Sequence, residues 1–137
     1  MILLDTNVIS ELMKRPADPN VAHWFQTHDP LCFLPSPALA EMAFGIARLP
    51  HGTRRRELET KLSEWRLRYA HRTLSFTGTT AMIYGTVMAE ALASGHNMSV
   101  VDGQIAAAAV EHGAALATRN IRDFMVTSVS IINPWDI

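Results

Sequence analysis

Four acidic residues of this 137-residue chain have types and positions that favour metal-dependent chemistry: Asp5, Glu41, Asp102 and Asp123. Oxygen ligands select hard cations such as Mg²⁺ or Mn²⁺, which keep several waters and leave positions for phosphate oxygens. Such an ion can lower the pKa of an attacking water and stabilise a leaving oxygen, so no side-chain nucleophile is needed. If the four carboxylates converge, the chemistry they predict is hydrolysis of phosphodiester bonds.

Glu41 carries the strongest of these signals. It is the sole polar side chain between Ala38 and Ala47, in a helical pattern whose other residues are Ala, Leu, Met, Phe, Gly and Ile. A helix without a polar face is expected to be buried, and burial of an unpaired carboxylate is costly. We therefore favour a partner cation for Glu41. A buried ion pair with an arginine such as Arg48 is the alternative.

Asp5 and Asp123 each follow a strand pattern, at residues 2–4 and 114–117 respectively. Ligands of open parallel sheets bind beyond the carboxyl ends of strands, which is where both acids are expected. Taken alone, Asp5 is explained equally well as the cap of a helix beginning at Thr6, and Asp123 as an ordinary loop residue.

Asp102 opens an apolar helical segment, three residues after Ser99. This spacing also fits the carboxylate half of a capping box, so the structural explanation is strong. Gly103, which costs roughly 1 kcal/mol relative to alanine inside a helix, indicates that another group approaches the first turn closely. An acid at a buried helix start can serve both purposes.

The elements that must position these acids alternate along the chain. Short β patterns cover residues 2–4, 31–34, 73–76, 114–117 and 129–132, with helical patterns between them. This alternation predicts an α/β sandwich around a mostly parallel sheet of about five strands, flanked by helices. No repeat or linker interrupts residues 1–137, so we expect a single domain.

Several helices have recognisable boundaries or faces. Asp18-Pro19 and Ser36-Pro37 each place a capping side chain before a proline at the first helical position. Residues 53–70 form an amphipathic pattern, typical of a surface helix. Few charges occur from Thr73 to Thr118, so the helix at residues 81–93 is expected to be largely buried.

Composition restricts the possible classes of function. The net charge of -1 excludes a broad basic field, so a nucleic acid would have to be bound by a local patch. The only cysteine, Cys32, lies in an apolar run and is expected to be a buried thiol. No signal peptide or apolar run of membrane-spanning length is present, which predicts a cytoplasmic protein without a membrane partner.

Competing chemistries lack their motifs. The chain has neither a phosphate-binding glycine loop nor a nucleophile elbow, and its six histidines show none of the close pair spacings of a zinc site. The tripeptide Asp5-Thr6-Asn7 partly matches haloacid-dehalogenase phosphatases, but those have a second aspartate where this chain has Asn7. That class is rejected.

Four segments together resemble the PIN-domain toxins, most closely the VapC family and its FitB-like branch. They are MILLDTNVISEL, ALAEMAFGIARLP, MSVVDGQIAAAA and ALATRNIRDF, the last followed by NPWDI. The resemblance spans essentially the whole chain. It implies a PIN-like domain whose metal-binding and catalytic positions are Asp5, Glu41, Asp102 and Asp123.

Further properties come from the resemblance alone. Thr6 and Thr118 match positions with a hydroxyl beside the site, and Asn120 belongs to the same loop. The family implies a Mg²⁺- or Mn²⁺-dependent endoribonuclease, the toxin of a type II toxin-antitoxin pair. It also implies a homodimer inhibited by a small cognate antitoxin, which alone would contact operator DNA. One departure is Thr77, where many relatives have an acid, and a threonine can still cap the following helix.

Two other functions remain open at this point. One is a catalytically silent module that binds RNA or an antitoxin, and the other is a DNA nuclease of the same fold. Arg119 and Arg122 are candidate phosphate contacts, whereas the arginines at 54–56 are better explained as a solvated helix face. The apolar residues Leu12, Met13, Trp24 and Phe25 could form a partner groove, although such residues are more often core.

Overall fold

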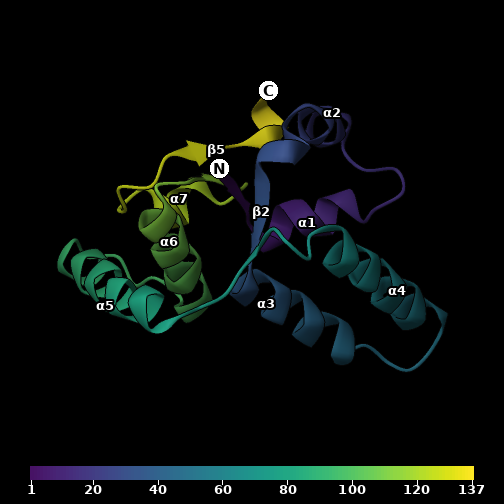
Figure 1. Ribbon diagram of the computed structural model, residues 1–137, viewed down its shortest axis with the longest axis horizontal. Coiled ribbons are helices and arrows are strands. Elements are labelled where there is room, and N and C mark those ends of the chain that lie inside the picture. Colours follow the sequence, from purple (N-terminus) through teal and green to yellow (C-terminus); the bar gives the residue numbers. More distant parts are fainter.

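The computed structural model describes all 137 residues and contains a five-stranded parallel sheet (Figure 1). The strands are β1 (Ile2–Leu4), β2 (Cys32–Pro35), β3 (Thr73–Leu74), β4 (Ala115–Ala117) and β5 (Ile131–Ile132). They lie in the order β3-β2-β1-β4-β5, and every neighbouring pair is parallel. The predicted α/β fold class and all five predicted strands are therefore confirmed, with small shifts of their ends.

Seven α-helices surround the sheet: α1 (Thr6–Leu12), α2 (Pro19–His28), α3 (Ser36–Ala47), α4 (Thr53–Arg68), α5 (Gly78–Ala93), α6 (Val100–His112) and α7 (Ile121–Phe124). Short 3₁₀ turns occupy Asp29–Leu31 and Pro134–Asp136. Figure 1 shows α1, α2 and α4 on one side of β2 and α5, α6 and α7 on the other.

The order of the strands defines where a ligand site is expected. The chain runs outward from the central β1 through β2 to β3, then crosses to the other side of β1 to form β4 and β5. The order reverses between β1 and β4, and in open parallel sheets ligands bind outside the carboxyl ends of strands at such a point. Leu3, Leu4 and Leu116 are fully buried and fix these two strands in the core.

The two predicted helix caps have different outcomes. Asp18 caps α2 as predicted, because its Oδ1 accepts a hydrogen bond from the backbone N–H of Asn20 at 2.8 Å. Ser36 is not a cap, because the helix α3 already includes it and Pro35 precedes it. The Ser36 hydroxyl instead accepts from the backbone N–H of Phe76 at 3.2 Å, so it joins α3 to the segment after β3.

The apolar residues offered as a partner groove belong mainly to the interior. Met13, Trp24 and Phe25 are buried members of the main hydrophobic core, and Leu12 packs against it. Their side chains stabilise the contact of α1 and α2 with the rest of the molecule. The alternative that assigned them to the core is therefore confirmed.

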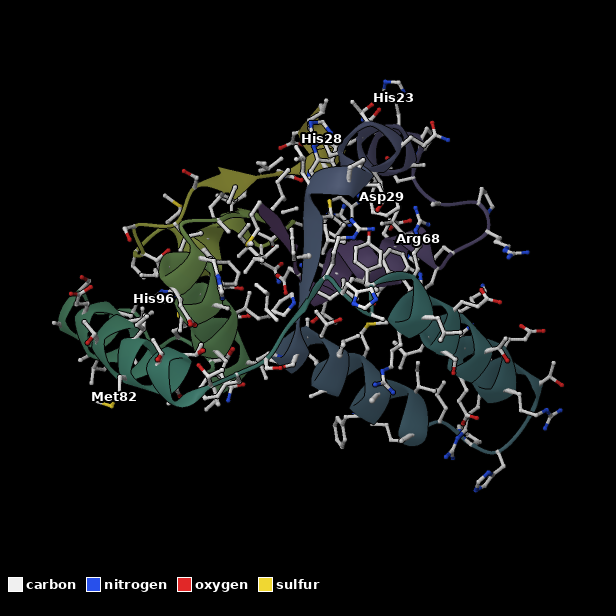
Figure 2. All side chains as sticks on the ribbon, viewed as in Figure 1. His23, His28, Asp29, Arg68, Met82 and His96 are labelled. Carbon is white, nitrogen blue, oxygen red and sulfur yellow. The ribbon has the colours of Figure 1, made fainter.

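The expectation that residues 81–93 are largely buried is wrong. Only Thr80, Val87 and Ala91 of α5 are buried, whereas Met82 is 77% and Leu92 is 70% exposed. In Figure 2, Met82 lies on the outer side of α5, away from α6. The physical reason is that α5 packs on α6 at the periphery and nothing covers its other side, so a scarcity of charge does not imply burial.

Candidate functional site

Asp5 and Thr118 meet at the point where the strand order reverses, directly after β1 and β4. Asp5 is only 3% exposed and Thr118 is fully buried. The Thr118 hydroxyl donates to Oδ2 of Asp5 at 2.7 Å, while Oδ1 of Asp5 accepts from the backbone N–H of Thr6 at 2.7 Å. Asp5 is thus both the cap of α1 and a buried carboxylate at the expected ligand edge, as the sequence allowed.

Asn7 and Asn120 extend this contact into a network. The side-chain amide of Asn7 lies 3.3 Å from both Oδ2 of Asp5 and the Thr118 hydroxyl, and its carbonyl accepts from the backbone of Arg119 at 3.2 Å. Asn120 contributes its backbone N–H, which donates to the Thr118 hydroxyl at 3.0 Å. Sequence reasoning did not assign Asn7 to the site. The available signal was an amide two residues after an aspartate at a strand end.

Asp102 lies in the first turn of α6, where Ser99 accepts from its backbone N–H at 3.2 Å. Gly103 explains the close approach that the sequence indicated, and the approaching group is helix α5. A Cβ atom on Gly103 would lie 2.9 Å from Cε2 of Tyr84 and closer still to Sδ of Met88. The glycine therefore lets α5 pack tightly against the turn that carries Asp102.

Burial and neighbouring carboxylates both raise the pKa values of the two more buried acids, Asp5 and Asp102. Burial raises the pKa of Asp5, and the charges of Glu41 and Asp123 raise it further, against the lowering effect of its hydrogen bonds. Burial and then the charge of Asp5 raise the pKa of Asp102 to about 6, with smaller contributions from Asp123 and Glu41. Glu41 and Asp123 therefore lie near enough for their charges to act on both Asp5 and Asp102.

Glu41 lies in a different environment than the sequence suggested. It is exposed, and α3 buries only the side that carries Pro37, Ala38, Met42 and Ile46. The inference that Glu41 has no solvated side is therefore wrong, because an apolar helix is not necessarily covered on every face. The alternative ion pair with Arg48 is absent, and the Arg48 guanidinium lies 5.7 Å from the centre of the Phe44 ring.

Asp123 lies in the short helix α7 and is half-buried. Its backbone N–H donates to the carbonyl of Asn120 at 3.2 Å, which ties it to the loop after β4. Of the arginines predicted to contact phosphate, Arg119 places its guanidinium 5.1 Å from the centre of the Trp135 ring, and Arg122 is exposed. The structure directs Arg119 toward the C-terminal segment.

The four acids do not converge on one point as closely as expected. No three or more histidine, cysteine, aspartate or glutamate side chains lie close enough together to hold a metal ion. The donor set nevertheless fits a hard cation, because it consists of oxygen atoms only. The buried Thr6 hydroxyl beside it has no hydrogen-bond partner.

A groove of about 850 Å³ lies between α1, α3 and α4, and both Thr6 and Glu41 line it. Its cationic lining residues are Lys14, Arg15, Arg54 and Lys61. Met42, Ile46 and Leu58 contribute apolar surface. The four cationic side chains outnumber the two acids of the lining, Glu41 and Glu57, so the groove is locally basic on a chain whose net charge is -1. None of the helices has the length and hydropathy required to cross a membrane.

Comparison with known proteins agrees with this architecture. The PIN domain family model matches residues 2–127. A VapC ribonuclease of Sinorhizobium fredii is 40% identical over 138 residues and covers 99% of each chain. Toxin FitB of Neisseria gonorrhoeae is 35% identical, covering 98% of this chain and 99% of its own.

Solved structures extend the similarity to three dimensions. The crystal structure of FitAcB from Neisseria gonorrhoeae matches with a TM-score of 0.89 and 34% identity, covering 100% of both chains. VapBC-1 from nontypeable Haemophilus influenzae shares the fold at 22% identity, with a TM-score of 0.81. The strand order, the acidic group at its reversal and these matches lead to one conclusion: the chain belongs to the PIN-domain family.

Proposed function

We propose that this protein is a metal-dependent endoribonuclease and the toxin of a type II toxin-antitoxin pair. The observation that carries the proposal is the buried Asp5 carboxylate at the reversal point of a parallel sheet, with the charges of Glu41 and Asp123 acting on both Asp5 and Asp102. The relatives of this chain include a protein named as a VapC ribonuclease and one named as Toxin FitB. Both cover almost the whole chain, which favours the same activity here.

The residues that would hold Mg²⁺ or Mn²⁺ are Asp5, Glu41, Asp102 and Asp123. When bound, such a cation supplies charge neutralisation and activation of water for attack on a phosphodiester. Asp5 is already held in one orientation by donors on both of its oxygens. The metal would therefore bind at least one carboxylate that is already oriented. Ligands that are held in place by such hydrogen bonds increase metal affinity.

RNA is the substrate class that we propose, and the basic groove beside Glu41 supports it. Lys14, Arg15 and Lys61 offer positive charge to a phosphate chain that reaches the acids. Arg54 lines the same groove, although the sequence alone favoured a solvated helix face for it. Arg122 is a further candidate phosphate contact because it is exposed next to Asp123. Arg119 is a weaker candidate, because its guanidinium packs against the Trp135 ring.

A small cognate antitoxin and a second copy of this chain are the proposed protein partners. One similar solved structure is that of FitAB bound to a DNA fragment. By analogy, this chain would contact operator DNA only through its antitoxin and would act in the cytoplasm. The exposed apolar side of α5, which includes Met82 and Leu92, supports a homodimer.

Cleavage assays on purified, antitoxin-free protein test the proposal. Labelled RNA and DNA of identical sequence are incubated with Mg²⁺, with Mn²⁺ or with EDTA. We expect cleavage of RNA in either metal, none in EDTA, and a loss of about 100-fold or more in Asp5→Asn, since one ligand carboxylate is removed. The matched control is Asp136→Asn, which neutralises an exposed aspartate near the C-terminus.

Three results would reject parts of this proposal. Cleavage that persists equally in EDTA and in Asp5→Asn would exclude the metal mechanism. Binding of RNA or antitoxin without any cleavage would identify a silent binding module. Preferential cleavage of DNA would identify a DNA nuclease of the same fold.

A further inference from the structure

We infer that Asn7 is a positioning residue, which orients Asp5 toward the bound metal ion and holds the loop that leads to Asp123. The inference rests on the proposed function. Asn7 lies in the first turn of α1, two residues after Asp5, and is itself half-buried. Its side chain connects the end of β1 with the segment after β4, more than a hundred residues away in the chain.

The partners of Asn7 define one orientation of its amide. Nδ2 lies 3.3 Å from Oδ2 of Asp5 and 3.3 Å from the Thr118 hydroxyl, while Oδ1 accepts from the backbone N–H of Arg119 at 3.2 Å. A flipped amide would place its oxygen against a carboxylate oxygen and its NH₂ group against an N–H donor. All three contacts would then be lost. The amide therefore cannot turn without breaking the network.

Donor and acceptor capacity around Thr118 is fully used. The Thr118 hydroxyl has one proton, which it donates to Asp5, and its lone pairs accept from Asn120 and Asn7. Oδ2 of Asp5 thus receives two donors and Oδ1 receives one, from Thr6. Because an ionised carboxylate has about four lone-pair sites, the remaining acceptor capacity of Asp5 lies on Oδ1. Asn7 helps to keep that oxygen available for a cation.

The side-chain oxygen of Asn7 also holds the loop that carries a second carboxylate, Asp123. Oδ1 of Asn7 holds the backbone of Arg119, and the next residue, Asn120, accepts from the backbone N–H of Asp123 at 3.2 Å. A loss of the Asn7 amide therefore disturbs both the orientation of Asp5 and the loop that places Asp123. Groups that orient metal ligands in this way typically contribute 10- to 100-fold to metal affinity or activity.

The test uses Asn7→Ala and Asn7→Leu, because leucine is close to asparagine in shape but has no amide. The matched control is Asn20→Ala, because the Asn20 amide also joins an early helix to the C-terminal segment, donating to the carbonyl of Trp135 at 3.0 Å. Titration calorimetry measures the affinity for Mn²⁺, and cleavage of an RNA oligonucleotide gives kcat and KM. Urea denaturation measures the free energy of unfolding. We expect both Asn7 variants to lose about 10- to 100-fold in Mn²⁺ affinity and in kcat, with a KM close to wild type. The Asn20 variant is expected to keep wild-type Mn²⁺ affinity.

A purely structural Asn7 gives a different pattern. Folded Asn7 variants with lower stability but wild-type Mn²⁺ affinity and kcat would overturn the inference. Failure of both variants to fold would do the same, because it would make the amide a requirement of the fold. If wild-type protein neither binds Mn²⁺ nor cleaves RNA, the proposed function itself fails, and that result is separate from either outcome for Asn7.

Discussion

Replacement of Asp102 by asparagine is predicted to stabilise the metal-free protein. Burial and the charge of Asp5 raise the pKa of Asp102 from 3.8 to about 6. Between these values the folded state binds the proton more tightly than the unfolded chain. The stability that this proton contributes is therefore fully present below pH 3.8, and it is lost as the pH rises through about 6. Asparagine keeps the size of the side chain and carries no charge to desolvate.

The magnitude follows from the shift in pKa. The rise in the pKa of Asp102 from 3.8 to about 6 corresponds to roughly 3 kcal/mol. Asp102 is partly accessible to solvent, so we expect about 1–2 kcal/mol in the free energy of unfolding above neutral pH. For a domain of 137 residues this corresponds to a rise in Tm of roughly 3–8 °C.

The assay is urea denaturation of wild type and Asp102→Asn in EDTA, at about pH 7.5 and about pH 4.5. The variant should be more stable at the higher pH, and the difference should shrink at the lower one. Addition of Mn²⁺ at about a hundred times its Kd stabilises a binding-competent protein by about 2.7 kcal/mol, so the order of stability should reverse. Asp136→Asn should show neither effect.

Two results would refute this reasoning. A variant less stable than wild type in EDTA at about pH 7.5 would show that burial and neighbouring charge do not destabilise ionised Asp102. An unchanged order of stability after Mn²⁺ is added would remove Asp102 from the proposed ligand set, even if the first result were as expected.

Further predictions concern packing and thiol reactivity. Gly103→Ala should lower the free energy of unfolding by about 1–2 kcal/mol, because contact with Tyr84 and Met88 outweighs the gain of roughly 1 kcal/mol in helix propensity. Gly85 in α5 has open space around it, so Gly85→Ala should instead raise the free energy of unfolding by up to about 1 kcal/mol. Equal effects of the two substitutions in urea denaturation would contradict this account. Cys32 is fully buried and burial raises its pKa to about 11, so a thiol reagent should label it only after denaturation. Rapid labelling of the folded protein would show that β2 is accessible.

The fold was largely predictable because its signals are local. Asp18-Pro19 starts α2 where the cap is expected, and short apolar runs form the strands at their predicted positions. Burial was less predictable, as Glu41 and Met82 show. A helix with few charges can pack on one side only, and periodicity does not reveal which faces another element covers.

The candidate site was predictable in its residues more than in its geometry. Asp5 and Asp102 act as a helix cap and a capped first-turn residue, so their local signals had two valid explanations at once. Thr118 could be identified only by resemblance, because its partner Asp5 is remote in sequence. Asn7 was missed for the same reason. Its role depends on Arg119 and Thr118, which only the folded sheet brings near.

The central position of β1 has a consequence for the order in which the protein is synthesised. Asp5 is translated more than a hundred residues before Thr118, which holds its carboxylate. A growing chain can pair β1 with β2 early, but one edge of β1 stays open until β4 emerges from the ribosome. A chain that terminates before α6 lacks Asp102 and Asp123, so the proposed nuclease activity, if it depends on all four acids, arises only after Asp123 has been translated.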